Sequence, residues 1–133
     1  MITEKIKKIF FCVKNNFNDK MKPYDLTAAQ IILLEYLNEN KDQVIILKDL
    51  CEYLSLKHST VISVLKRLES KELITRKTNY KSKISITEKG IGIIKSAGIK
   101  KGFCENELLK DFTKEEINEL SNYLDRIYSN INK

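Results

Sequence analysis

The sequence predicts a mainly α protein with one small β-hairpin. Apolar residues recur at helical spacing over most of the 133 residues, and two short β-rich runs lie close together in the second half. Positive charge gathers in the same region as these runs. With 42% hydrophobic and 32% charged residues, the composition is that of a globular chain rather than a disordered one, and a single domain is expected for residues 1–133.

Two helices are expected before residue 40. Isoleucines, phenylalanines and a valine repeat at the spacing of one helix face over residues 4–18, which predicts an amphipathic helix ended by Lys22-Pro23. Thr27-Ala28-Ala29-Gln30 has the form of a capping box and opens a second helix that runs to about Asn38. Apolar residues cover nearly the whole circumference of this second helix, so it is expected in the core.

Two further helices are predicted in quick succession. A short β-branched run at residues 44–46 precedes a helix of about two turns at 47–54, and a tight connection at 55–58 leads to a helix at 59–70. One stripe of the last helix is apolar, formed by Val61, Val64, Leu65 and Leu68. Its opposite face is polar and basic, with Thr60, Ile62, Ser63, Lys66, Arg67 and Lys71.

A β-hairpin follows these helices. Residues 73–78 and 83–87 are rich in β-branched residues, and Asn79-Tyr80-Lys81-Ser82 joins them, so the predicted hairpin has a basic and aromatic tip. A helix, a short turn, a second helix and a hairpin form a winged helix-turn-helix, expected here over residues 27–87. Such a helix fits the major groove of DNA, and flanking lysines and arginines reach phosphates.

The C-terminal part is expected to be helical. From Glu88 a helix is predicted to run toward Lys110, weakened by glycines that make a break between Gly98 and Gly102 plausible. Thr113-Lys114-Glu115-Glu116 is a second capping box, and it opens a final helix with a continuous apolar stripe.

The positive charge is concentrated in one segment. Residues 57–83 hold eight bases and two acids, whereas the other 106 residues hold 16 of each, so this segment carries the whole net charge of +6. A neutral body with one basic segment is expected of a protein that neutralises phosphates with one face. A lysine-rich solvated surface is the alternative explanation of the charge alone.

Three sequence blocks resemble the multiple antibiotic resistance regulator (MarR) family of winged-helix transcription factors. They are Leu26-Thr27-Ala28-Ala29-Gln30, the run from Ser59 to Arg76, and Ile86-Thr87-Glu88-Lys89-Gly90. The start of the last helix, from Phe112 to Ile117, is also similar, and residues 39–41 and 47–50 more weakly resemble the staphylococcal accessory regulator branch. The resemblance implies a sequence-specific regulator of double-stranded DNA. A repressor is expected rather than an activator, because blocking a promoter requires no further contact, and the lack of a secretory signal predicts a cytoplasmic protein.

The resemblance also implies the DNA-contacting residues. Helix 59–70 would enter the major groove and wing 73–87 would lie on the backbone or in the minor groove. The implied contacts are Ser59, Thr60, Ile62, Ser63, Lys66 and Arg67 on the helix and Lys77, Tyr80, Lys81 and Lys83 on the wing. For each of these residues, the alternative interpretation is an ordinary solvent-exposed side chain that does not contact DNA.

Two departures from the family pattern affect this interpretation. Glu72 stands where the family usually has Gly, so helix 59–70 is expected to end without the easy left-handed cap. Between Lys77 and Thr87 there is neither Asp nor Arg, so the wing lacks the Asp-x-Arg that many members carry. Lys81, Lys83 and Tyr80 would have to take the place of that arginine, and lysine has no planar fork like that of arginine.

The sequence contains few residues that could form a catalytic or metal-binding site. His58 is the only histidine, and Cys12, Cys51 and Cys104 are widely spaced, so neither a metal, another cofactor nor enzymatic activity is expected. Cys12 and Cys51 are interpreted as buried apolar residues and Cys104 is left undecided, with oxidant sensing at Cys12 a minor alternative. No apolar run is long enough to span a bilayer, and no secretory signal is recognised.

The terminal helices, residues 1–22 and 88–133, are expected to form a homodimer. Their apolar stripes exceed what a small winged core can cover, and twofold symmetry would then match a pseudopalindromic operator. The alternative is a single chain whose end helices cover each other. Two other functions remain open: a winged helix that binds an acidic protein, and a sensor with an unidentified small-molecule effector between these helices and the winged core.

Overall fold

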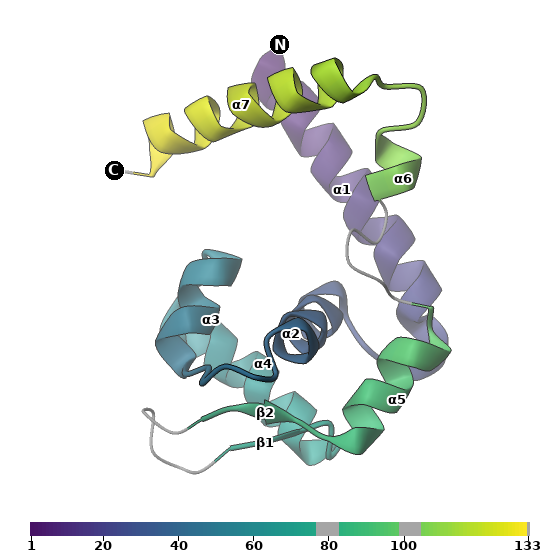
Figure 1. Cartoon of the computed structure of the whole chain (residues 1–133), viewed down its shortest axis with the longest axis vertical. Coiled ribbons are helices and arrows are strands. Elements are labelled where there is room, and N and C mark those ends of the chain that lie inside the picture. The colour runs from purple at the N-terminus through teal and green to yellow at the C-terminus, as the bar shows by residue number, and fades with distance from the viewer. Residues whose placement is uncertain (77–82, 99–104, 133) are drawn as a thin grey trace. The chain divides into compact units, whose positions relative to one another are not determined.

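The computed structural model describes residues 1–76, 83–98 and 105–132 (Figure 1). The chain forms two compact units, residues 1–101 and 102–133. The first unit contains α1 (Ile2–Met21), the 3-10 turn η1 (Lys22–Tyr24), α2 (Ala28–Glu39), α3 (Leu47–Leu54), α4 (His58–Ser70), β1 (Ile74–Thr75), β2 (Ser85–Ile86) and α5 (Glu88–Ser96). The second contains α6 (Glu105–Leu108) and α7 (Lys114–Ile131). A mainly α fold with one small hairpin is therefore confirmed.

The junction of α1 and α2 is built from local capping contacts. The helix predicted at 4–18 extends over Ile2–Met21 and ends, as predicted, where Pro23 enters η1. The capping box at Thr27 is confirmed, because the N–H of Gln30 donates to Thr27 Oγ1 at 3.3 Å and the N–H of Thr27 donates to Gln30 Oε1 at 3.1 Å. Asn18 Oδ1 accepts from the N–H of Ala28 at 2.9 Å, which ties α1 to the start of α2.

Helix α2 lies at the centre of the first unit, as its all-round apolar sequence predicted. In Figure 1 it is surrounded by α1, α3, α4, α5 and the hairpin, and it contacts α1, α4, β2 and α5. Four of its apolar side chains are at most 2% exposed, and they pack with buried residues of α1, α3 and α4. The core includes Met21, Ile31, Leu33, Leu34, Leu37, Leu50, Val61, Leu65 and Leu68.

Helix α4 ends in a left-handed turn, contrary to the expectation from Glu72. Glu72 itself adopts φ 61°, and its N–H donates to Glu69 O at 2.9 Å while the N–H of Leu73 donates to Leu68 O at 3.0 Å. These two bonds form a Schellman motif without a glycine. Leu68 and Leu73 are both almost completely buried, and the burial of these two side chains offsets the cost of a left-handed glutamate.

The hairpin is antiparallel and contacts two neighbouring segments of the first unit. Ile74 pairs with Ile86 and Thr75 with Ser85, inside the two predicted β-rich runs. The N–H of Ile84 donates to Ile45 O at 2.8 Å, so the β-branched run before α3 borders the returning arm. Gly90 of α5 approaches so closely that a Cβ there would lie 2.6 Å from Leu73 O. The predicted tip, residues 79–82, lies outside the described residues, as do residues 77 and 78 of the predicted first arm.

The helix predicted from Glu88 toward Lys110 is interrupted, and the predicted break at its glycines is confirmed at Gly98. Helix α5 ends at Ser96, and α6 is a separate short helix of four residues. The cause is Gly98, which adopts φ +69° at the predicted break, where a left-handed residue terminates the helix. Cys104 and Gly102 lie outside the described residues.

The second unit is dominated by α7. Its capping box is confirmed, with Thr113 N–H donating to Glu116 Oε1 at 2.8 Å and Glu116 N–H donating to Thr113 Oγ1 at 3.1 Å. No side chain of α7 is buried, and several apolar ones are half or more exposed, including Tyr123, Tyr128 and Ile131. Over the described ranges, no helix is long and apolar enough to cross a bilayer.

Candidate nucleic-acid interface

Helices α3 and α4 pack against each other and are joined by a three-residue turn, residues 55–57. Asp49 accepts a hydrogen bond of 2.9 Å from the N–H of Ile46 and so caps the start of α3. Ser55 adopts φ 53° at the end of α3, and the N–H of Leu56 donates to Cys51 O at 3.2 Å. This compact turn is what lets α4 lie across α3 as the second helix of a helix-turn-helix.

Helix α4 has one buried and one exposed side, as its sequence predicted. Val61, Leu65 and Leu68 are at most 1% exposed, whereas Val64 is only half-buried. Five of the six predicted contact residues on this helix are exposed: Ser59, Thr60, Ser63, Lys66 and Arg67. Ile62 is half-buried, so its side chain offers less surface than the sequence pattern suggested.

Two of the eight bases of the basic segment form ion pairs, so fewer of them are available to bind phosphates than the residue count suggested. Lys71 Nζ lies 3.4 Å from Asp25 Oδ2 and also donates to the backbone oxygen of Asp25. Arg76 Nε lies 2.6 Å from Glu69 Oε1. Lys57, Lys66 and Lys83 are exposed and form no ion pair within the parts of the chain that the structure describes. Three predicted wing residues, Lys77, Tyr80 and Lys81, lie outside those parts.

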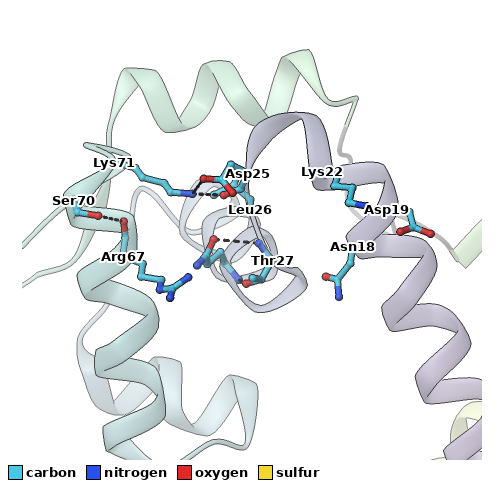
Figure 2. A pocket seen from close by; sticks show the side chains of 10 residues that line it. Asn18, Asp19, Lys22, Asp25, Leu26, Thr27, Arg67, Ser70 and Lys71 are labelled. Carbon is cyan, nitrogen blue, oxygen red and sulfur yellow. Dashed lines mark hydrogen bonds and ion pairs between the residues drawn. The ribbon is translucent and has the colours of Figure 1, made fainter.

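A cavity of about 450 Å³ lies between α1, the start of α2 and the end of α4 (Figure 2). Arg67 extends into this space from α4, beside Thr27, and Asn18 faces it from α1 (Figure 2). Its lining carries charges of both signs, from Asp19, Lys22, Asp25, Arg67 and Lys71. The sequence pattern did not reveal this cavity, because its lining comes from three separate segments. Arg67 therefore borders both the exposed face of α4 and the cavity.

The cysteines and His58 do not form a reactive or metal-binding cluster among the described residues. The prediction that Cys12 is buried is wrong: Cys12 is exposed, because the face of α1 around Ile9 and Phe10 is itself exposed within this chain. Cys51 is half-buried rather than fully in the core, and burial, with a smaller contribution from Glu52, raises the pKa of its thiol. His58 is exposed at the first residue of α4.

A buried central helix, a helix-turn-helix with an exposed polar face and an anchored hairpin define a winged helix-turn-helix protein. The model of the MarR family matches residues 24–83, the span of this winged helix. The whole chain is also similar to solved regulators. These likenesses relate the winged helix of this chain to that of the MarR family, whose members are transcription regulators and not enzymes.

Three solved structures illustrate the likeness. The MarR transcription regulator of Oenococcus oeni PSU-1 is 26% identical, with a TM-score of 0.85 over 97% of this chain and 99% of that one. A putative MarR-family regulator of Listeria monocytogenes, complexed with 26mer DNA, is 27% identical, with a TM-score of 0.81 over 98% and 89%. The Staphylococcus aureus MepR–DNA complex is 22% identical, with a TM-score of 0.89 over 98% and 96%.

Proposed function

We propose that the protein is a sequence-specific regulator of transcription that binds double-stranded DNA through α4 and the wing. The observation that carries this proposal is the division of α4 into a buried apolar side and an exposed side with small polar residues and two bases. Such a helix enters the major groove without steric conflict. The Listeria and Staphylococcus structures, both solved with DNA, support the same function.

Each exposed residue of α4 has a proposed part in this contact. Ser59, Thr60 and Ser63 approach base edges, and Arg67 joins them from the C-terminal half of the helix. Ile62 contacts a thymine methyl with the part of its side chain that remains exposed, and Lys66 contacts a phosphate. The wing, residues 73–87, lies on the backbone or minor groove, with Lys83 and the predicted contacts Lys77, Tyr80 and Lys81.

A salt titration tests this proposal. Binding of labelled duplex from the region upstream of the protein's own gene is measured by fluorescence anisotropy at several salt concentrations. Lys66→Ala is expected to lower the slope of log K against log salt by about 0.9, the value for one lost phosphate contact. Lys114→Ala, which removes an exposed lysine at the start of α7, serves as the matched control and is expected to leave the slope unchanged.

Base reading is tested separately. Ser63→Arg places a long cation on the groove-facing side and is expected to change the preferred sequence in a selection from randomised duplexes. If the wild-type protein retains no duplex at about 0.1 M salt, the DNA-binding proposal fails and the alternative of an acidic protein partner gains support.

The proposed assembly is a homodimer formed by the terminal helices, residues 1–22 and 88–133. Four apolar side chains of α1, Ile2, Ile6, Ile9 and Phe10, are 42–64% exposed, and the apolar residues of α7 are exposed as well. An apolar area of this kind is covered in solution by a second subunit. Phe10→Glu is expected to shift the sedimentation mass toward the monomer and to weaken binding to a pseudopalindromic duplex. A wild-type chain that sediments as a monomer contradicts this assembly.

The proposed sign of regulation is repression, because a bound dimer blocks a promoter without any further contact. A reporter gene under the protein's own upstream region tests it. Expression is expected to rise when the protein is deleted, and a fall on deletion indicates activation instead.

A response to a small-molecule effector is the second candidate function, favoured by the cavity between α1 and α4. Its volume of about 450 Å³ suits a small ligand, and Arg67 belongs both to its lining and to the exposed face of α4. A ligand held there would compete with DNA for the guanidinium of Arg67. A thermal-shift screen of a small-molecule library, followed by DNA titration with any stabilising compound, tests this function.

A further inference from the structure

The last turn of α4 is linked to the wing by one ion pair. Arg76 Nε donates to Glu69 Oε1 at 2.6 Å, and their side chains are 17% and 34% exposed. The Lys71–Asp25 pair is more open, because Asp25 is 99% exposed. A short, charge-assisted bond between partly enclosed groups holds its geometry better than an exposed surface pair.

The pair lies at a position that determines where the wing begins. Glu69 is one residue before the end of α4, and Arg76 directly follows β1, next to the segment 77–82. The other arm of the hairpin is held by the N–H of Ile84, which donates to Ile45 O at 2.8 Å, just before α3. Both arms are therefore fixed to the helix-turn-helix, one by a side-chain pair and one by a backbone bond.

We propose that Glu69 and Arg76 are positioning residues that fix the direction in which the wing leaves α4, and that Arg76 does not neutralise a phosphate. This inference rests on the proposed DNA-binding function. Arg76 is one of the eight bases of the basic segment, yet its charge is directed at Glu69. The two described arms of the wing and α4 then meet DNA in a fixed relative direction, which lowers the ordering cost of binding.

The direction in which Glu69→Ala changes the affinity for DNA distinguishes a positioning role from a simple electrostatic one. Glu69→Ala removes a negative charge close to the proposed DNA surface, so electrostatics alone would tighten binding. Positioning requires the opposite, a loss of roughly three- to tenfold in affinity for the selected duplex. Glu69→Gln keeps an oxygen that accepts from Arg76 and is expected to recover part of the loss. Glu52→Ala removes an exposed acid of α3 and is the matched control, with affinity unchanged or slightly higher.

The salt dependence of DNA binding tests whether Arg76 neutralises a phosphate. Arg76→Ala is expected to weaken binding while leaving the slope of log K against log salt at its wild-type value, since no counterion release is lost. A slope lowered by about 0.9 would show that Arg76 contacts a phosphate and would overturn the assignment. In the double variant Glu69→Ala/Arg76→Ala, the affinity is expected to match that of either single variant, because both remove the same interaction.

A measurement without DNA keeps the inference separate from the proposed function. Amide hydrogen exchange of β1 and β2 is compared with that of the buried helix α2 in the full chain. Glu69→Ala and Arg76→Ala are expected to speed exchange in the hairpin selectively, because they release one arm. Unchanged hairpin exchange in both variants overturns the positioning role even if they bind DNA less well. If the wild type binds no DNA but the hairpin responds selectively, the proposed function fails and the structural link stands.

Discussion

The amide oxygen of Asn18 accepts a hydrogen bond of 2.9 Å from the backbone N–H of Ala28, the first residue of α2. A helix leaves its first N–H groups without partners inside the helix, so a side chain of α1 satisfies one of them from outside. The same two residues fix the angle between α1 and the central helix. α1 therefore enters the first unit through a specific polar contact as well as through its buried apolar residues Phe17 and Met21.

Asn18→Ala is expected to lower the free energy of unfolding by about 1 kcal/mol, because it removes a capping bond and leaves a partly buried N–H unpaired. Urea denaturation followed by circular dichroism measures the change. Asn16→Ala, on the exposed part of the same helix, is the control and is expected to stay within about 0.5 kcal/mol of the wild type. Equal effects of the two variants would show that the Asn18 bond contributes nothing specific.

Gly90→Ala is expected to destabilise the protein by about 1–3 kcal/mol. A Cβ at this position would lie 2.6 Å from Leu73 O and 2.7 Å from Ile86 Cγ1, and the backbone oxygen cannot move without disturbing the hairpin. Gly92→Ala is the matched control in the same helix, because a Cβ there meets nothing within 4 Å. The free energy of unfolding of Gly92→Ala is expected to rise by about 0.5–1 kcal/mol, because alanine has the higher helix propensity. Chemical denaturation should therefore show that Gly90→Ala destabilises the protein and Gly92→Ala stabilises it.

Glu72→Gly is expected to stabilise the protein by about 0.5–1 kcal/mol. Glu72 adopts φ 61°, a conformation that costs an ordinary residue about 1–2 kcal/mol and glycine almost nothing, although glycine loses more entropy on folding. Thermal unfolding measures the gain. Ser70→Gly, two residues earlier and within α4, is the control and is expected to lower stability. If Glu72→Gly also destabilises the protein, the glutamate side chain has a compensating contact.

Glu35→Gln is expected to change the pH dependence of stability. Burial raises the pKa of Glu35 above its usual 4.5, and the nearby Glu39 adds to the effect. Between the unfolded and the folded pKa the native state binds more protons, so the contribution of Glu35 to stability falls as pH rises through that window. At pH 7 the variant is expected to be more stable by about 0.3 kcal/mol, the scale of one like-charge pair on a helix. The difference should vanish below the unfolded pKa, as measured by urea denaturation at several pH values.

The helices could be predicted wherever the determining residues are close together in the sequence. The capping boxes at Thr27 and Thr113 are confirmed, and so is the apolar stripe that buries Val61, Leu65 and Leu68, because caps and helix faces are local properties. The left-handed Glu72 could not be predicted from local preference, because the burial of its neighbour Leu73 and the backbone bond from Leu73 to Leu68 decide it. Tertiary packing outweighs conformational preference there.

The candidate site was only partly predictable for the same reason. Exposure along α4 followed from helical periodicity, so Ser59, Thr60 and Ser63 lie where they were expected. The partners of Lys71 and Arg76 did not follow from the pattern, and both bases had been counted as available positive charge. The cavity between α1, α2 and α4 has no periodic signature, because its lining residues come from segments that are far apart in the sequence.

The hydrogen bond between Ile84 and Ile45 has a consequence for how the chain folds. These residues enclose α3, α4 and β1, so their contact closes a long loop and carries a correspondingly large entropic cost. α3 and α4 are neighbours along the chain and are expected to form and pack early, and the strand that returns from the wing is expected to dock after them. A refolding chain therefore acquires its paired helices before its wing is fixed, and mutations at Ile45 or Ile84 should speed unfolding more than they slow folding.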